Sequence, residues 1–295
     1  MKPAPFKYAC PGSVDEALAL LQVGGDEAKV LAGGQSFVPL LNLRMASVES
    51  IVDLNRLDDL AYIKRDNDTL CIGAMTRHRQ IEVSDEVRAA QPLLCRAAAE
   101  VGHLAIRNRG TIGGSLVHAD PAAEWPLVAA ALDAQFVLRS QDNSRTIAAR
   151  EFFLAPLMTA IEPHEILCEV RFPVAPAGAV WGFQELCRRP GDFAIVAIAC
   201  QLTLDAGGTC SAVSLAIGGA HSTPLYVAEV EPILIGSQGD AAVMTAAAEK
   251  AAAAVDPSGD VHGSADYRRR MVKVLTQRAL KEAWDKAAKS ERVLQ

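Results

Sequence analysis

Two short glycine-containing motifs, far apart in the chain, constrain its fold more than any other feature. Because glycine has no Cβ, its backbone can turn with a positive φ and approach a ligand closely. Consecutive N–H groups in such a turn form an anion-binding concavity, to which a serine hydroxyl adds a donor. The pair predicts two loops that hold the two phosphates of a dinucleotide from either side. The motifs consist of Ala32, Gly33, Gly34, Gln35 and Ser36, and of Thr111, Ile112, Gly113, Gly114 and Ser115 with Gly110 leading into them.

Neither motif has the spacing of the common phosphate-binding loops. Neither reads G-x-G-x-x-G, and neither ends in the Lys-Ser or Lys-Thr pair of a P-loop. A nicotinamide-binding Rossmann domain and a Walker-type ATPase are therefore both disfavoured.

Composition and charge narrow the classes of protein to which the chain could belong. The chain has 295 residues, enough for two or three packed units, and half of them are hydrophobic. Its formal net charge of -6 leaves no basic excess to neutralise phosphates, which argues against nucleic acid as a partner. The seven cysteines include no C-x-x-C pair, and the histidines include no H-E-x-x-H, so no metal or iron–sulfur site is expected in this chain.

The order of the predicted elements indicates an α+β fold. Ser13 and Glu16 have the spacing of a capping box before a first helix, and residues 60–64 and 69–73 form a predicted hairpin. Residues 107–115 are too rich in glycine and polar side chains for a packed element, so a loop is expected there. Further elements are predicted as follows: short strands over 29–31, 50–54, 135–139 and 145–148, longer strands over 193–204 and 210–217, and helices over 92–102, 122–134, 241–255 and 265–289.

The sequence also indicates a domain boundary and a cellular location. The proline-rich stretch 173–178 marks a domain boundary, with one domain over 1–176 and a second over 177–295. The first residues lack the order of a secretory signal, and no stretch approaches the roughly 18 apolar residues of a membrane span. A cytoplasmic protein without a membrane span is expected. The run Arg268 to Arg270 is interpreted as a solvated helix face.

With their flanking residues, the two motifs resemble the FAD-binding medium subunit of the carbon monoxide dehydrogenase and xanthine dehydrogenase family of molybdenum hydroxylases. The resemblance covers essentially the whole chain in family order. Its blocks are LAGGQSFVPLLNLRM over 31–45, GAMTR over 73–77, RGTIGGSLVHADPAAEWP over 109–126, EILCEVRFP over 165–173 and RRPGDFAI over 188–195.

The resemblance implies a two-lobed FAD-binding domain of the vanillyl-alcohol-oxidase or p-cresol-methylhydroxylase type, with lobes over about 1–56 and 57–176. A small α+β domain of the carbon monoxide dehydrogenase flavoprotein C-terminal type follows. The two glycine motifs would bind the pyrophosphate of FAD. Glu124 stands where the family usually has an aspartate that bonds the ribityl hydroxyls, with Asp120 as the alternative acceptor. Ile166 and Leu167 match a strand whose backbone contacts the cofactor.

Two positions in the last matching regions bear on the flavin ring. Phe193 stands where relatives often have a tyrosine over the isoalloxazine, so it keeps the stacking face and loses the hydroxyl. Some relatives place a lysine near the position of Glu185, by the polar edge of the flavin. A cation there stabilises reduced flavin, so Glu185 suggests a lower reduction potential than in relatives with the lysine, unless an arginine such as Arg188 compensates.

By the same resemblance, this chain is an electron carrier with no catalytic side chain of its own. A large partner subunit would hold molybdopterin, a small one would hold two [2Fe–2S] clusters, and a dimer of heterotrimers is expected. Two alternatives remain: a self-sufficient flavin oxidase of the same FAD-binding superfamily, and a flavin-free assembly scaffold. The substrate stays open among carbon monoxide, a purine or other N-heterocycle, an aldehyde and an aromatic thioester.

Overall fold

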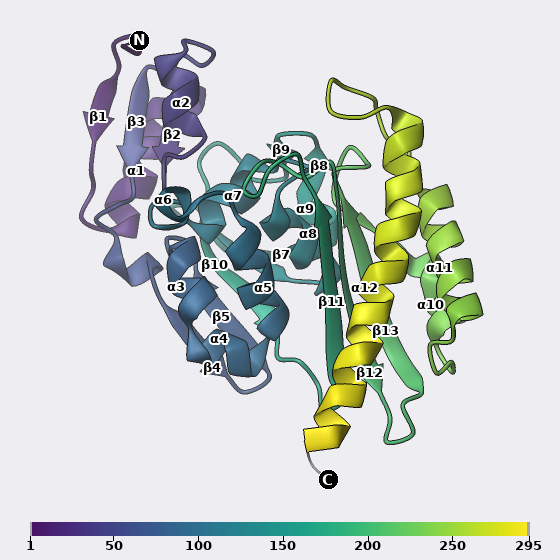
Figure 1. Cartoon of the computed structure of the whole chain (residues 1–295). Coiled ribbons are helices and arrows are strands. Elements are labelled where there is room, and N and C mark those ends of the chain that lie inside the picture. The colour runs from purple at the N-terminus through teal and green to yellow at the C-terminus, as the bar shows by residue number, and fades with distance from the viewer. Residues whose placement is uncertain (1, 294–295) are drawn as a thin grey trace.

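The computed structural model describes residues 2–293 and contains sheets of three, five and four strands with a two-stranded ribbon (Figure 1). The first lobe is the three-stranded sheet, whose strands are parallel in the order β1-β3-β2. This lobe departs from the hairpin organisation of the other sheets, because helices connect its parallel strands. Its elements are β1 (Lys7–Ala9), α1 (Val14–Gly24), β2 (Ala28–Leu31), α2 (Phe37–Asn42) and β3 (Ser50–Asp53).

The start of α1 shows how the local sequence sets a helix end. The Ser13 Oγ accepts a hydrogen bond from the Glu16 N–H at 3.1 Å, as predicted. The Glu16 carboxylate accepts from the Gly12 N–H at 2.8 Å instead of returning to Ser13, so the predicted capping box is shifted by one residue. Ala17, Leu18 and Leu21 then bury one face of α1 in the first lobe.

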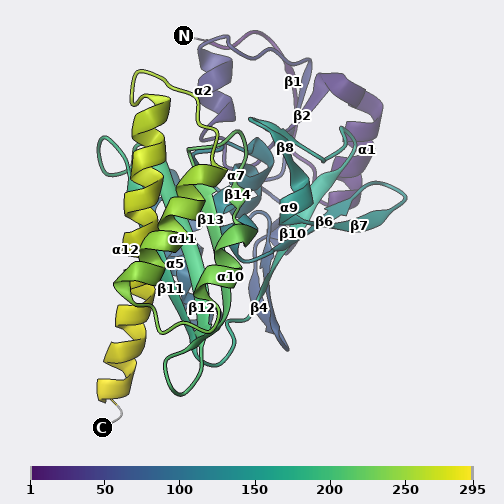
Figure 2. The same cartoon turned by 90° about the vertical axis from the view of Figure 1, so that its right-hand side faces the viewer.

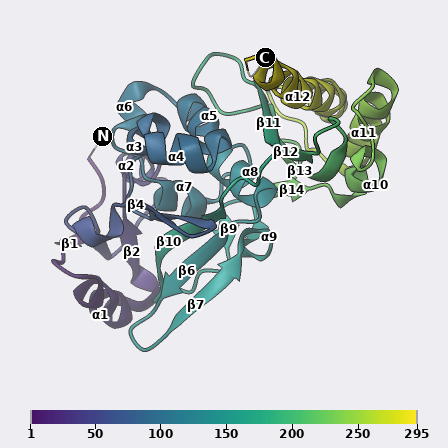
Figure 3. The same cartoon turned by 90° about the horizontal axis from the view of Figure 1, so that it is seen from below.

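The second lobe is an antiparallel sheet in the order β4-β5-β10-β6-β7, with several helices over one of its faces (Figure 3). The predicted hairpin over 60–73 is present as β4 and β5. β10 is the central strand and is mostly buried, since it pairs with both β5 and β6. The elements are β4 (Ile63–Asp66), β5 (Thr69–Gly73), α3 (His78–Val83), α4 (Asp85–Ala90), α5 (Pro92–Glu100), α6 (Leu104–Arg107), α7 (Ile112–His118), α8 (Glu124–Ala131), β6 (Gln135–Arg139), β7 (Ser144–Ala148), α9 (Ala149–Phe152), β8 (Phe153–Ala155), β9 (Met158–Thr159) and β10 (Ile166–Pro173).

The prediction of a loop over 107–115 is confirmed for residues 108–111 but is wrong at both ends, since Arg107 still belongs to helix α6. The chain instead begins helix α7 at Ile112, with the Thr111 hydroxyl accepting from the Gly114 N–H at 3.1 Å. Gly113 is fully packed, because an added Cβ would lie 2.6 Å from the Cβ of Ala74. Tertiary contact therefore overrides the low helix propensity of the two glycines.

The C-terminal domain is an antiparallel sheet in the order β11-β12-β13-β14. Helices α11 and α12 lie across one face (Figure 2), and α5 and α8 of the second lobe pack against the sheet as well. β12 begins at Val196 rather than at the predicted Phe193, because the connection from β11 runs on to Ile195. The elements are β11 (Ala179–Leu186), β12 (Val196–Leu204), β13 (Cys210–Gly218), β14 (Leu225–Tyr226), α10 (Glu231–Leu234), α11 (Ala241–Ala254) and α12 (Ala265–Val293).

Between residues 2 and 293, no helix is long and apolar enough to span a membrane. The same residues include no cluster of three or more histidine, cysteine, aspartate or glutamate side chains suited to a metal ion.

Candidate functional site

A cavity of about 1310 Å³ lies where both lobes and the C-terminal domain meet. It exceeds the roughly 300–1,000 Å³ of common ligand pockets, which suits an extended dinucleotide. Both glycine motifs line it. Of the residues predicted to bind the cofactor, the lining includes Ala32, Gly33, Gly34, Gln35, Ser36, Gly110, Thr111, Gly113, Gly114, Ser115, Asp120, Glu124, Ile166, Leu167 and Phe193. Ile112 and Glu185 are not part of it.

The first glycine motif presents donors that the protein itself does not use. Within residues 2–293, no group accepts a hydrogen bond from the backbone N–H of Gly34, Gln35 or Ser36. Gly34 has a φ of 73°, the left-handed conformation that favours glycine. Backbone donors that line a cavity without a partner fit an anionic ligand such as a pyrophosphate.

The second motif is organised differently from the first. Its N–H groups at Ile112 and Gly113 donate to the carbonyls of Thr76 and Ala74, at 3.1 and 2.9 Å. Ile112 is fully buried in the core of the second lobe. The prediction that both motifs form equivalent N–H concavities is therefore corrected: the first supplies free donors, and the second supplies a closely packed wall.

The two motifs touch one another. A Cβ added to Gly33 would lie 2.6 Å from both the Arg109 carbonyl oxygen and the Gly110 Cα. Gly110 is equally restricted, since its added Cβ would lie 2.6 Å from the Nε2 of His78. These glycines are required by close backbone approach, and the approach brings parts of both lobes to one wall of the cavity.

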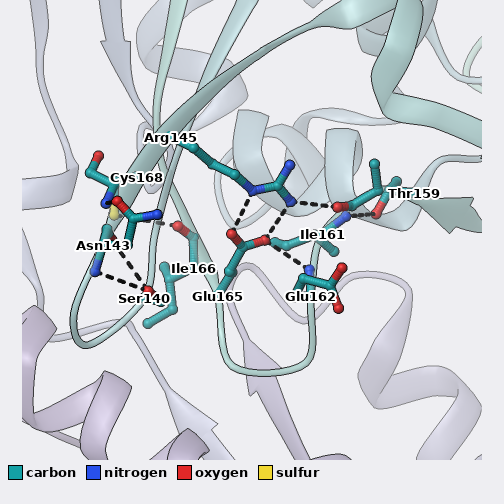
Figure 4. A network of polar contacts seen from close by, with 11 residues as sticks. Ser140, Asn143, Arg145, Thr159, Ile161, Glu162, Glu165, Ile166 and Cys168 are labelled. Carbon is teal, nitrogen blue, oxygen red and sulfur yellow. Dashed lines mark hydrogen bonds and ion pairs between the residues drawn. The ribbon is translucent and has the colours of Figure 1, made fainter.

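A loop before β10 completes another wall and is fixed by an ion pair (Figure 4). Arg145 on β7 donates two hydrogen bonds to the Glu165 carboxylate at 2.7 Å and one to the Ala160 carbonyl at 2.7 Å. Burial alone would raise the pKa of Glu165, but the bonds from Arg145 and from the Glu162 N–H lower it below its usual value. The ordered loop places Ile166 and Leu167 along the cavity.

Two carboxyl groups, the buried Glu124 and the half-buried Glu185, lie near the junction of the second lobe and the C-terminal domain. Glu124 begins α8, is 7% exposed, and its pKa is raised to about 7, mainly by burial. Glu185 is on β11, and its buried Oε2 has no hydrogen-bond partner among residues 2–293. Burial and then the charges of Glu124 and Glu100 raise the pKa of Glu185 to about 8. At pH 7 Glu185 is thus mostly protonated, which removes most of the charge reversal inferred from its sequence position.

The C-terminal domain contributes residues that the sequence analysis did not identify. The cavity lining includes Gly219, His221, Ser222, Asp260, His262 and Arg268. The interpretation of Arg268 as part of a solvated face was wrong: it is 7% exposed and donates to the Gly219 carbonyl at 2.6 Å and to Asp260 at 2.6 Å. The missed signal was periodicity, because Arg268 is one helical turn before the buried Val272 on α12.

A buried pair, His78 and Trp125, supports the second motif from behind. The Trp125 indole N–H donates to the His78 Nδ1 at 2.9 Å, and the backbone N–H of His78 donates to the Gly110 carbonyl at 3.1 Å. Burial, followed by the charges of Arg77 and Arg107, lowers the pKa of His78 to about 3, so the ring stays neutral and can accept the bond.

We expect Trp125→Phe to destabilise the protein by about 2 kcal/mol, because it leaves the His78 nitrogen unsatisfied and removes ring volume from the core. Urea unfolding followed by circular dichroism measures the change. Trp284→Phe is the matched control, since the Trp284 N–H bond is long, at 3.5 Å, and only part-buried. Equal destabilisation by both changes would contradict the role given to the His78 bond.

Comparison with known proteins assigns both parts of the chain to flavoprotein families. Residues 4–175 match the family described as FAD binding domain in molybdopterin dehydrogenase, and residues 181–283 match the carbon monoxide dehydrogenase flavoprotein C-terminal domain. The chain is 44% identical to the 6-hydroxypseudooxynicotine dehydrogenase complex subunit alpha of Paenarthrobacter nicotinovorans, over 97% of each chain. It is 37% identical to the carbon monoxide dehydrogenase medium chain of Hydrogenophaga pseudoflava, over 98% of this chain and all of the other.

A solved structure of carbon monoxide dehydrogenase from Hydrogenophaga pseudoflava, which lacks the Mo-pyranopterin moiety of its cofactor, matches with a TM-score of 0.94. The identity is 38%, and the match covers 97% of this chain and 99% of the other. Both predicted domain types are therefore present in the expected order. The chain belongs to the family of FAD-binding medium subunits of molybdenum hydroxylases related to carbon monoxide dehydrogenase.

Proposed function

We propose that this chain holds FAD in the cavity between its lobes and its C-terminal domain, and passes electrons from an iron–sulfur subunit to an external acceptor. A large subunit with molybdopterin would oxidise the substrate, and a small subunit with two [2Fe–2S] clusters would deliver the electrons. A dimer of such heterotrimers in the cytoplasm is part of the proposal. The free N–H groups of the first glycine motif carry the argument, because they offer the cavity's clearest site for a pyrophosphate.

Bound FAD would supply the chemistry of accepting and releasing electrons. The residues of this chain have the tasks of binding and orientation. Gly34, Gln35 and Ser36 would donate to the pyrophosphate, and Glu124 or Asp120 would accept from hydroxyls of the ribityl chain. Phe193, on the C-terminal side of the cavity, is 68% exposed and would present its ring face to the flavin. None of these roles requires a nucleophile or a general base.

The test is to isolate the tagged chain from its native host and record the absorbance spectrum of the eluate. We expect a larger and a smaller partner to co-elute with flavin and iron–sulfur absorbance. A yellow chain that elutes alone and oxidises small alcohols or phenols would instead identify a self-sufficient flavin oxidase.

A colourless chain that still co-elutes with both partners would identify an assembly scaffold. The structure favours the carrier over the scaffold, because the N–H groups of Gly34, Gln35 and Ser36 line the cavity and have no acceptor within residues 2–293. Adding FAD to the colourless chain and measuring fluorescence quenching separates a lost cofactor from a lost binding site.

A further inference from the structure

The two glycine motifs lie in different lobes, and two side chains outside the cavity lining connect them. Asn55 follows β3 of the first lobe, and Arg77 is the residue before α3 of the second lobe. Neither residue lines the cavity. No single sheet contains both motifs, so their spacing depends on contacts between the lobes.

The hydrogen bonds form a continuous bridge from one motif to the other. The Asn55 side-chain amide donates to the Ala32 carbonyl at 2.8 Å, within the first motif. The Arg77 Nη2 donates to the Asn55 Oδ1 at 2.7 Å, and the Arg77 Nη1 donates to the Arg109 carbonyl, directly before Gly110. The two side chains thus join the carbonyl groups of Ala32 and Arg109.

The bridge is anchored on the first lobe by a buried carboxylate. Asp53 is 8% exposed and accepts from the Asn55 N–H at 2.9 Å and from the Tyr8 hydroxyl at 2.6 Å. The Asn55 side-chain amide also donates to Asp53, at 2.5 Å, which holds its nitrogen toward Ala32 and its oxygen toward Arg77. An asparagine is needed at this position, because the bridge uses both a donor and an acceptor.

Arg77 is committed to this bridge and not to an ion pair. Within residues 2–293, no carboxylate lies in salt-bridge contact with its guanidinium. Burial and then the charge of Arg109 lower the pKa of Arg77, while the charge of Asp53 opposes the shift. The N–H groups of this partly buried cation donate to an asparagine and a loop carbonyl, both neutral acceptors. Arg77 therefore fixes the positions of these groups and does not neutralise a charge.

We propose that Asn55 and Arg77 are positioning residues that set the spacing of the two glycine motifs for the pyrophosphate of FAD. The inference rests on the proposed function. At Gly33 the motifs already touch, so a small displacement of one lobe would open or close the cradle. The bridge holds the contact from outside the cavity lining.

The experiment measures FAD affinity by quenching of flavin fluorescence, using the full chain at a temperature where circular dichroism shows each variant to be folded. We expect Arg77→Ala, Arg77→Lys and Asn55→Asp each to weaken FAD binding by roughly 10- to 100-fold. Lysine keeps the charge but lacks the planar fork that spans two acceptors. Aspartate keeps the shape but loses the donor to Ala32.

Arg79→Ala is the matched control, because Arg79 lies two residues after Arg77, on α3, and pairs with Glu82 at 3.0 Å instead of joining the bridge. It should leave FAD affinity unchanged. If the Arg77 and Asn55 variants only lower the melting temperature of the FAD-free chain and bind FAD like the unaltered chain, the residues are merely structural and the inference fails. If the unaltered chain itself does not bind FAD, the proposed function fails first. Non-additive losses in the Arg77→Ala, Asn55→Ala double variant would support a single bridge.

Discussion

Replacing Gly33 with alanine is expected to weaken FAD binding by about 100-fold or more. The added Cβ would lie 2.6 Å from the Arg109 carbonyl oxygen and the Gly110 Cα, and both are backbone atoms that cannot turn away as a side chain can. The two motifs must then separate, because interiors at native packing density do not absorb an extra methyl group without a backbone shift. The backbone N–H groups of the first motif, which would donate to the phosphates, would then move away from the opposite wall of the cavity.

Fluorescence titration of the folded variant with FAD measures this effect. Gly12→Ala is the matched control, since it makes the same change in the same lobe where the nearest atom to an added Cβ, on the Glu16 side chain, is 3.8 Å away. We expect the control to bind FAD normally. An unchanged affinity in Gly33→Ala would show that the contact between the motifs is not needed for the cofactor.

The second large effect concerns the pH dependence of stability through Glu185. Its pKa is raised to about 8 in the folded chain, from a model-peptide value of about 4.3 when unfolded. Between these values the folded chain keeps a proton that the unfolded chain has released. The free energy of unfolding therefore falls as the pH rises through this window, by an amount on the order of a few kcal/mol, and does not depend on Glu185 below it.

Glu185→Gln removes this titration, so the variant should equal the unaltered chain near pH 4 and exceed it in stability near pH 9. Part of the slope will remain, because Glu124 also has a raised pKa, of about 7. The other charged groups that face Glu185 are Glu100 and Arg96 on α5. Urea unfolding at a series of pH values makes the measurement, with the exposed Glu86→Gln as control. Parallel curves for Glu185→Gln and the unaltered chain would contradict a buried, proton-retaining carboxyl.

The same protonation bears on the flavin potential. Glu185 does not line the cavity, but an ionised carboxylate behind its wall would still disfavour a reduced flavin more than a protonated one. We therefore expect the reduction potential of the FAD-loaded chain to fall more steeply with rising pH near pH 8 than that of Glu185→Gln. Redox titration between pH 6 and 9 tests this, and identical slopes would place Glu185 too far from the flavin to matter.

Local sequence determined those features whose physical cause lies within a few residues. Ser13 caps α1, the polar turn at residues 67 and 68 joins β4 to β5, and the alanine-rich segment forms α11. The glycine pairs at 33–34 and 113–114 indicated a phosphate cradle because only glycine tolerates such close backbone approach. The matching blocks around them were enough to indicate the family and its two-domain fold.

Tertiary structure decided what depends on groups distant in the sequence. The second motif begins a helix because carbonyls of Ala74 and Thr76 accept its N–H groups. Arg268 is buried because Gly219 and Asp260 accept from it across the C-terminal domain. The Asn55–Arg77 bridge exists only once the lobes meet. Propensity and periodicity report on neighbours along the chain, whereas burial, pKa shifts and unpaired donors are set by neighbours in space.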